Sequence, residues 1–228
     1  MKTIWKITAL SLVVASGAAS GQTVEALQTS PALTFRMPTS ISAVCRTIAA
    51  AGANLWNSSG ARITFTNGGT YTAKVGRTLG SAISVEPGSM IPDLPANAQA
   101  YTDRRFTTYD PAKGYWRTDS FNVIVNETTL SGGGFYCGST TKIGAGATPS
   151  RTADFQDIIS YEFGHGIGLV HDSVVYPTML YSPVYQTYSM RALSSRDRAG
   201  AVSIMGAKLH LYSPYCRWCL RAHVLHQR

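Results

Sequence analysis

The stretch ISYEFGHGIGLVHDSVVYPTML, residues 159–180, decides how this chain is interpreted. It continues an apolar stripe that begins at Phe155, and this spacing predicts a helix with Thr152 as its N-cap. At about 100° per residue, Tyr161 and His165 project together from another face of the helix. The helix therefore has an apolar face for packing and a second face with two candidate ligands.

Glycines determine where this helix ends. Gly166 or Gly168 should end it, because glycine adopts turn conformations that other residues resist. After the turn, His171 can return toward His165. Glu162 lies one helical turn before His165 in an apolar helix, where an unpaired carboxylate is costly unless a metal or a water network requires it. This arrangement predicts a metal site with a carboxylate beside it.

Two histidines with a nearby carboxylate are typical of a catalytic zinc site. Such a site uses about three protein ligands and one water, whose proton the carboxylate can accept. His165 and His171 supply two ligands, and Tyr161 stands where a third is needed. A phenolate can bind zinc, but its usual pKa of about 10 makes deprotonation costly. Two alternatives stay open: Tyr161 is a ligand, or it packs beside an empty or weakly filled site, with Asp172 as a further candidate ligand.

A family resemblance is carried by the same residues. The segment YEFGHGIGLVH, residues 161–171, resembles the metzincin signature H-E-x-x-H-x-x-G-x-x-H at every fixed position but the first. EFGHGIGLVH is most similar to the matrixin branch of that family. Met179 falls where matrixins place the methionine of their Met-turn. Pro183 and Tyr185 resemble the segment that forms the wall of the matrixin substrate pocket, with one extra residue before it.

The resemblance implies an α+β fold, namely a metzincin-like catalytic domain with a twisted mixed sheet, an active-site helix, a Met-turn and a C-terminal helix. It covers residues 32–206 and is strongest over residues 155–185. It also implies that His165 and His171 bind one zinc ion and that Glu162 activates a water.

Other residues gain roles from the same resemblance. Met179 would form a hydrophobic floor under the metal, and Gly168 is the turn glycine of the signature. Tyr181 resembles the tyrosine with which the astacin and serralysin branches stabilise the transition-state oxyanion; its alternative is an aromatic residue of the pocket wall. Tyr161 replaces the first histidine of the signature and is the main departure from it. No calcium site can be assigned from the twelve acidic residues.

Two functions are compatible with these residues. The first is a secreted zinc-dependent endopeptidase that hydrolyses peptide bonds by metal-activated water and is impaired or adapted at Tyr161. The second is a catalytically inactive protein of the metzincin fold that holds peptides in its cleft. Glu162, His165, His171 and Met179 favour the first function, and Tyr161 favours the second. In both cases the expected partner is a protein or peptide.

The remaining sequence has the pattern of a mixed fold. Residues 32–37 and 61–66 resemble strands on either side of a helix over residues 40–56, with Ser40 as its cap. Residues 68–119 have no clear period, which predicts short strands and loops. The other predicted elements are a buried strand, a loop with an edge strand, and a last helix, over residues 120–127, 131–148 and 194–205.

The two ends of the chain are not expected to belong to the folded domain. Residues 1–21 have the charged start, apolar centre and small-residue exit of a signal peptide, and the apolar centre is shorter than the ~20 residues of a membrane span. We expect export to the extracellular space or the periplasm and no membrane contact after cleavage. Residues 22–206 should form one matrixin-like domain that is monomeric. Residues 207–228 are interpreted as a basic extension, with a fold-back that donates a histidine ligand as the alternative.

The cysteines and the charge distribution limit the possible disulfides and the possible partners of the chain. The four cysteines allow three pairings in an oxidising compartment, and we favour Cys45 with Cys137, which leaves Cys216 and Cys219 as a local pair. The net charge of +8 is scattered, without a block of lysine or arginine. We therefore expect no nucleic-acid partner.

Overall fold

The computed structural model describes residues 26–72, 83–88, 98–112, 114–138, 153–171 and 191–207. The predicted signal peptide lies outside these residues, as does the predicted C-terminal extension except Ala207, which forms an isolated antiparallel bridge with Ala61. The elements in chain order are β1 (Ala26–Gln28), β2 (Ala32–Pro38), α1 (Ala43–Asn57), β3 (Thr64–Tyr71), β4 (Ile83–Gly88), β5 (Ala100–Asp110), β6 (Tyr115–Asn126), α2 (Glu127–Ser131), β7 (Phe135–Tyr136), β8 (Ala153–Asp154), α3 (Phe155–Ile167) and α4 (Ser195–Met205).

Most of the strands form one mixed sheet. Its order is β1-β6-β4-β2-β3, and β5 pairs with β6. The β5–β6 pair is antiparallel, whereas the other pairs of this sheet are parallel. β7 and β8 form a separate parallel pair. A mixed sheet combined with helices agrees with the expected α+β class.

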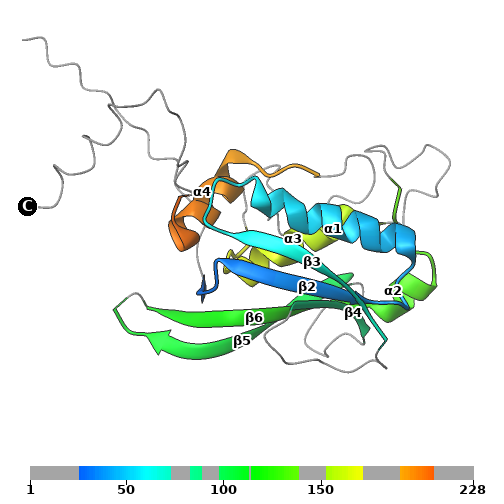
Figure 1. Cartoon of the computed structure of the whole chain (residues 1–228), viewed down its shortest axis with the longest axis horizontal. Helices are drawn as coiled ribbons and strands as arrows, with labels where there is room; N and C mark the ends of the chain where they lie inside the picture. The colour runs from blue at the N-terminus through cyan, green and yellow to red at the C-terminus, as the bar shows by residue number, and fades with distance from the viewer. Residues whose placement is uncertain are drawn as a thin grey trace, which may run out of the picture.

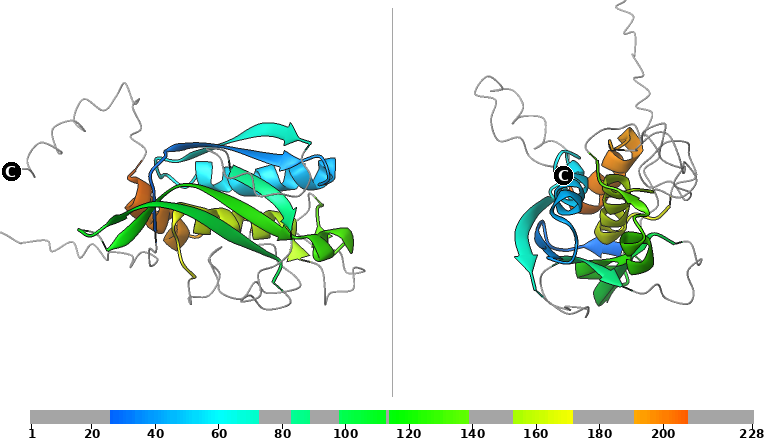
Figure 2. Two further views of the ribbon diagram at one scale, coloured as in Figure 1. Left: turned by 90° about the horizontal axis from the view of Figure 1, so that it is seen from below. Right: turned by 90° about the vertical axis from the view of Figure 1, so that its right-hand side faces the viewer.

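The helices α1 and α3 pack together over one face of the sheet, which curves around them (Figures 1 and 2). Gly52 of α1 permits this contact, because a Cβ atom there would lie 2.6 Å from the carbonyl oxygen of Gln156 on α3. The indole Nε1 of Trp56 donates a buried hydrogen bond of 2.8 Å to the carbonyl oxygen of Ser160. Close packing and one directional bond therefore fix how α3 lies against α1.

Aromatic packing fixes α3 against the sheet. The ring of Phe163 has its centroid 5.5 Å from that of Phe35, 4.8 Å from that of Phe65 and 5.3 Å from that of Phe121. All four side chains are buried, and the edge-to-face geometry is the one that aromatic pairs prefer. Phe163 thus anchors the middle of α3, and the polar face of the helix is held in a defined direction.

The expected strands and helices are largely confirmed, with differences at their ends. The first helix begins after Ser42, not Ser40, because the hydroxyl of Ser42 accepts a hydrogen bond from the backbone N–H of Cys45. The strand predicted to begin at residue 61 is β3, and it begins at Thr64. The prediction of short strands and loops for residues 68–119 was wrong for β5 and β6, which are 11 and 12 residues long. The last helix begins after Ser194, as expected.

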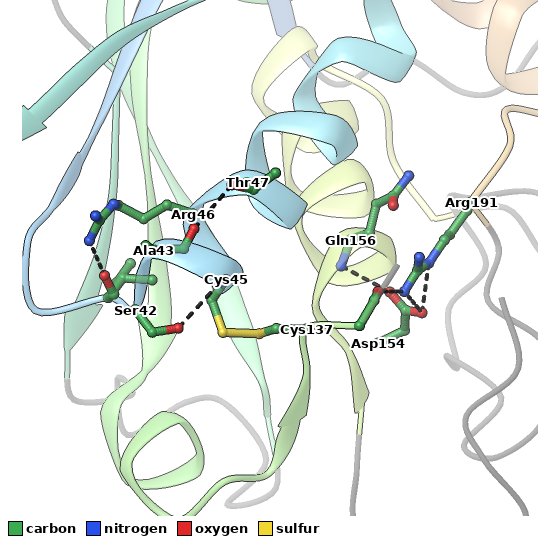
Figure 3. The surroundings of a disulfide bond; sticks show 11 residues. Ser42, Ala43, Cys45, Arg46, Thr47, Cys137, Asp154, Gln156 and Arg191 are labelled. Atoms are coloured by element: carbon green, nitrogen blue, oxygen red, sulfur yellow. Dashed lines mark hydrogen bonds and ion pairs between the residues drawn. A yellow bond between two sulfur atoms is a disulfide. The ribbon is translucent and has the colours of Figure 1, made fainter. Parts of the chain in front are cut away.

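The start of α3 is tied to the rest of the fold by charge. Asp154 is the N-cap, and its Oδ1 accepts hydrogen bonds from the backbone N–H groups of Gln156 and Asp157. The expected cap, Thr152, lies outside the described residues. The other carboxylate oxygen of Asp154, Oδ2, forms a buried ion pair with Arg191, whose Nη2 lies 2.7 Å away (Figure 3). The same nitrogen of Arg191 donates a hydrogen bond to the carbonyl oxygen of Gly138. A carboxylate can serve the helix N-terminus and an arginine together, which a threonine hydroxyl cannot.

The predicted disulfide between Cys45 and Cys137 is confirmed. It joins the first turn of α1 to the residue that follows β7, beside the ion pair of Asp154 and Arg191 (Figure 3). Two segments separated by 92 positions are thereby held together at the N-terminal end of α3. No helix in the described part of the chain is long and apolar enough to cross a membrane.

Candidate metal centre

The helix α3 presents its candidate ligands as the sequence predicted. Its apolar stripe of Phe155, Ile158, Ile159 and Phe163 is buried in the core. Tyr161 is half-buried, packs against the edge of the core and contacts His165 one turn later on the helix. Packing of one face therefore determines where the other face points.

A glycine turn ends α3 and redirects the chain. Gly168 is the C-cap, with φ of 120°, a backbone conformation that side-chain-bearing residues rarely adopt. Its N–H donates to the carbonyl oxygens of Gly164 and His165, and the N–H of Leu169 also donates to Gly164. The prediction that the helix ends near Gly166 or Gly168 is confirmed. The turn leads directly to His171.

Three aromatic side chains meet at the C-terminal end of α3. The ring centroids of Tyr161 and His165 are 4.7 Å apart, those of His165 and His171 4.9 Å, and those of Tyr161 and His171 5.8 Å. His171 is exposed, whereas Tyr161 and His165 are half-buried. The return of His171 toward His165, expected from the sequence, is confirmed. We call Tyr161, Glu162, His165 and His171 the candidate centre.

His165 is held in one tautomer. Its Nδ1 lies 2.8 Å from the carbonyl oxygen of Leu169. A carbonyl oxygen can only accept, so Nδ1 carries the proton and the lone pair of Nε2 is left for a ligand. The pKa of His165 is lowered to about 3, mainly by burial, while the hydrogen bond to Leu169 opposes that shift. A neutral imidazole oriented through its second nitrogen is the form that binds a metal.

Glu162 lies on the buried side of the candidate centre. The side chain is 4% exposed, and the hydroxyl of Thr102 on β5 lies 2.6 Å from its Oε2 and 2.7 Å from its backbone carbonyl oxygen. Burial raises the pKa of Glu162 to about 7, against the opposing effects of the Thr102 hydrogen bond and the positive charge of Arg104. A carboxylate with such a pKa is suited to accept and release a proton near neutral pH.

Within the described residues, Tyr161 is the residue that accompanies the two histidines at the candidate centre. No group of three or more His, Cys, Asp and Glu side chains within the described ranges could hold a metal ion. The two histidines are instead accompanied by Tyr161, whose ring is stacked on that of His171 with an interplanar angle of 15°. Two imidazoles supply nitrogen ligands of the kind that zinc accepts, and a phenol would have to lose its proton to supply an oxygen ligand. His165 and His171 thus fit the role of ligands, and Tyr161 is the third residue at the same place.

Several residues expected at the candidate centre lie outside the described residues. They are Met179, Tyr181, Pro183, Tyr185 and the alternative ligand Asp172. Their expected roles in the Met-turn, in oxyanion stabilisation, in the pocket wall and in metal binding stay predictions.

Sequence reasoning missed the contribution of β5. Thr102 and Arg104 act on Glu162, although Thr102 stands 60 positions before it. The run of Thr, Tyr and Phe in AYTDRRFTTYD could have indicated a strand. Nothing in that run indicates which helix the strand meets, because this depends on the sheet order.

A search against protein families and curated proteins finds no family model and no curated protein that matches this chain.

Proposed function

We propose that this chain is a secreted zinc-dependent endopeptidase of the metzincin type, similar to the matrixin branch. The observation that carries the proposal is the meeting of Tyr161, His165 and His171 within 5.8 Å of one another at the end of α3. The buried Glu162 on the same helix adds the proton acceptor that hydrolysis requires. The resemblance of residues 161–171 to the metzincin signature supports the same conclusion.

In the proposed reaction, the residues of the candidate centre have separate roles in metal binding, proton transfer and positioning. His165 and His171 would hold zinc, which when bound supplies a water of lowered pKa. Glu162 accepts the proton of the attacking water at a carboxylate oxygen and can pass it to the leaving amine. Thr102 holds that carboxylate from β5 through a hydrogen bond of 2.6 Å. The hydrogen bond from His165 to Leu169 keeps the imidazole in the tautomer that leaves Nε2 free.

An extended peptide has a place to bind beside the candidate centre. Within the described residues, β5 pairs with β6 along one edge only. A strand at the edge of a sheet can pair with a peptide through backbone hydrogen bonds. Because Thr102 joins β5 to Glu162, a peptide along this edge would run past the proposed proton acceptor.

The second candidate function is a catalytically inactive peptide-binding protein on the same scaffold. The observation that favours it is Tyr161, because a neutral phenol is a weaker ligand than the imidazole that the signature places there. The stacking of the Tyr161 ring on that of His171 is compatible with a packing role for the phenol.

Substitution of Tyr161 separates the two functions. Tyr161→His would place a third imidazole at the candidate centre, and zinc affinity should rise by more than about 100-fold, since even the outer partners of a ligand contribute about 10- to 100-fold. Peptidase activity should appear or rise strongly in the same variant. Competition with a chelator of known affinity measures the first effect, and cleavage of a quenched fluorescent peptide library measures the second.

Two further variants complete this experiment. Tyr161→Phe removes only the phenol oxygen, so unchanged zinc affinity in this variant would exclude Tyr161 as a ligand. Glu162→Gln in the Tyr161→His background should lower kcat about 100-fold or more while zinc stays bound, because the amide cannot accept the proton. Tight zinc binding by Tyr161→His without any cleavage would contradict the endopeptidase and favour the peptide-binding protein.

A further inference from the structure

A cluster of large exposed side chains lies on the β5–β6 hairpin. Phe106, Tyr109 and Trp116 are 49%, 46% and 48% exposed, and of the large apolar side chains in the described residues only Val44 shares such exposure. Figure 1 shows the two strands running on past the ends of β2 and β3. Three half-exposed aromatic rings on one hairpin are more than the scattered apolar residues of an ordinary surface.

The aromatic rings contact one another and an arginine. The centroid of Trp116 is 5.9 Å from that of Phe106 and 5.3 Å from that of Tyr109, its partner across the two strands. The guanidinium carbon of Arg104 lies 5.8 Å from the centroid of Phe106, within the range of a cation–π interaction. We call Arg104, Phe106, Tyr109 and Trp116 the aromatic–arginine strip.

This strip begins at the candidate centre. Arg104 follows Thr102 by two positions on β5, so both side chains point to the same face of the strand. The hydroxyl of Thr102 donates to Glu162, so this face of β5 meets α3 at the proposed proton acceptor. Arg104 therefore follows Thr102 on the face of β5 that meets Glu162, and its guanidinium contacts the exposed ring of Phe106.

We propose that the aromatic–arginine strip is a binding site for peptide substrates with an acidic side chain, whose carboxylate pairs with Arg104 while neighbouring residues pack on Phe106 and Trp116. This inference rests on the proposed function. A guanidinium presents a planar fork of donors that matches a carboxylate, and its contact with Phe106 holds it in place. The aromatic rings offer rigid apolar surface at low entropic cost.

Charge favours an acidic peptide over the nearest alternative occupant. The full sequence has a formal net charge of +8, and removal of Lys2 and Lys6 with the predicted signal peptide leaves 8 − 2 = +6, which attracts acidic partners. Its own C-terminal residues 208–228 contain lysine and arginine but no Asp or Glu, so they offer no carboxylate side chain for Arg104.

The experiment uses the full-length protein with zinc present and pairs of fluorescent peptides that differ by one Glu or Gln, moved along the peptide. Fluorescence anisotropy gives the dissociation constants, and mass spectrometry monitors cleavage. At one position the Glu peptide should bind about 3- to 10-fold more tightly, a size typical of a partly exposed charge pair, and salt should reduce this preference.

Variants on β5 test whether Arg104 causes the preference for the Glu peptide over the Gln peptide. Arg104→Gln should bring the Glu to Gln ratio close to one, and Arg104→Lys should keep only part of it, since the charge stays and the fork is lost. Arg105→Gln is the matched control, because this exposed neighbour points to the other face of β5, and it should keep the wild-type ratio. Thermal melts confirm that each variant is folded.

The outcomes distinguish this inference from the proposed function. Equal binding or cleavage of Glu and Gln peptides at every position would overturn the acidic preference and leave the endopeptidase standing. Failure of every peptide to bind would overturn both. A preference that survives Arg104→Gln but is lost in Arg105→Gln would also overturn the assignment. Binding to vesicles of phosphatidylserine through Trp116, without any Glu preference, would make the strip a lipid contact instead.

Discussion

At the scale of single residues, α3 carries two buried carboxylates in different surroundings. Glu162 receives a hydrogen bond from Thr102, whereas Oδ1 of Asp157 has no hydrogen-bond partner within the described part of the chain. The pKa of Asp157 is raised to about 7 by burial and by the negative charge of Asp154, against the opposing charge of Arg191. A polar group in this position costs stability when it is ionised.

The Asp157→Asn substitution tests this cost through its pH dependence. The pKa of Asp157 in the folded chain lies above the ordinary aspartate value of 3.8, so the folded chain binds the proton more tightly than the unfolded chain. Stability from this group is therefore present below about pH 4 and is lost as the pH rises to about 7. Asp157→Asn should raise the free energy of unfolding by about 1 to 3 kcal/mol at pH 8 and have little effect at pH 4.

Urea unfolding at the two pH values measures this difference. Glu127→Gln, which removes an exposed carboxylate from the first turn of α2, reports the effect of losing one negative charge at the surface. A loss of stability in Asp157→Asn at pH 8 would mean that the ionised carboxylate is satisfied in the fold.

At the scale of elements, sequence pattern predicts α1, α3 and α4 but not their first residues, and it does not predict the short helix α2, whose first residue Glu127 it assigns to a strand. Period and glycine placement gave α3, its end and the return of His171, because these depend on local conformation. The cap of α1 was misplaced by two residues, since Ser40 and Ser42 are chemically the same and only the fold selects between them. The role of β5 could not be predicted, because the contact of Thr102 with Glu162 arises from the sheet order.

The turn after α3 carries the element-scale prediction. Gly168→Ala places a side chain at φ of 120°, and the free energy of unfolding should fall by about 1 to 2 kcal/mol. The altered turn should also move His171 and weaken zinc binding. Gly60→Ala is the control, because Gly60 has φ of 85° and a Cβ atom there would meet nothing within 4 Å.

Urea unfolding and chelator competition in the Tyr161→His background separate the two effects. Both glycine variants should lose stability, and only Gly168→Ala should lose zinc affinity. Equal zinc affinity in the two variants would show that the turn does not position the histidine.

At the scale of the whole molecule, two kinds of bond hold distant segments around α3. The ion pair of Asp154 with Arg191 and the disulfide of Cys45 with Cys137 both lie at the N-terminal end of the helix (Figure 3). The candidate centre lies at the other end, since the eleven positions from Asp154 to His165 span about 16 Å of helix. Structural bonds and proposed chemistry are thus separated along one element, and loss of the first need not disturb the second.

The double substitution Cys45→Ser with Cys137→Ser tests this separation. A crosslink over 92 positions restricts the unfolded chain, so its loss should lower stability by about 2 to 4 kcal/mol and the melting temperature by roughly 5 to 15 °C. Zinc affinity at temperatures well below melting should stay that of the wild type. The pair Cys216→Ser with Cys219→Ser removes the same number of sulfur atoms and serves as the control in calorimetry and chelator titration. A parallel fall in zinc affinity and melting temperature would mean that α3 transmits strain along its length, and the two ends of the helix would then have to be treated as one cooperative unit.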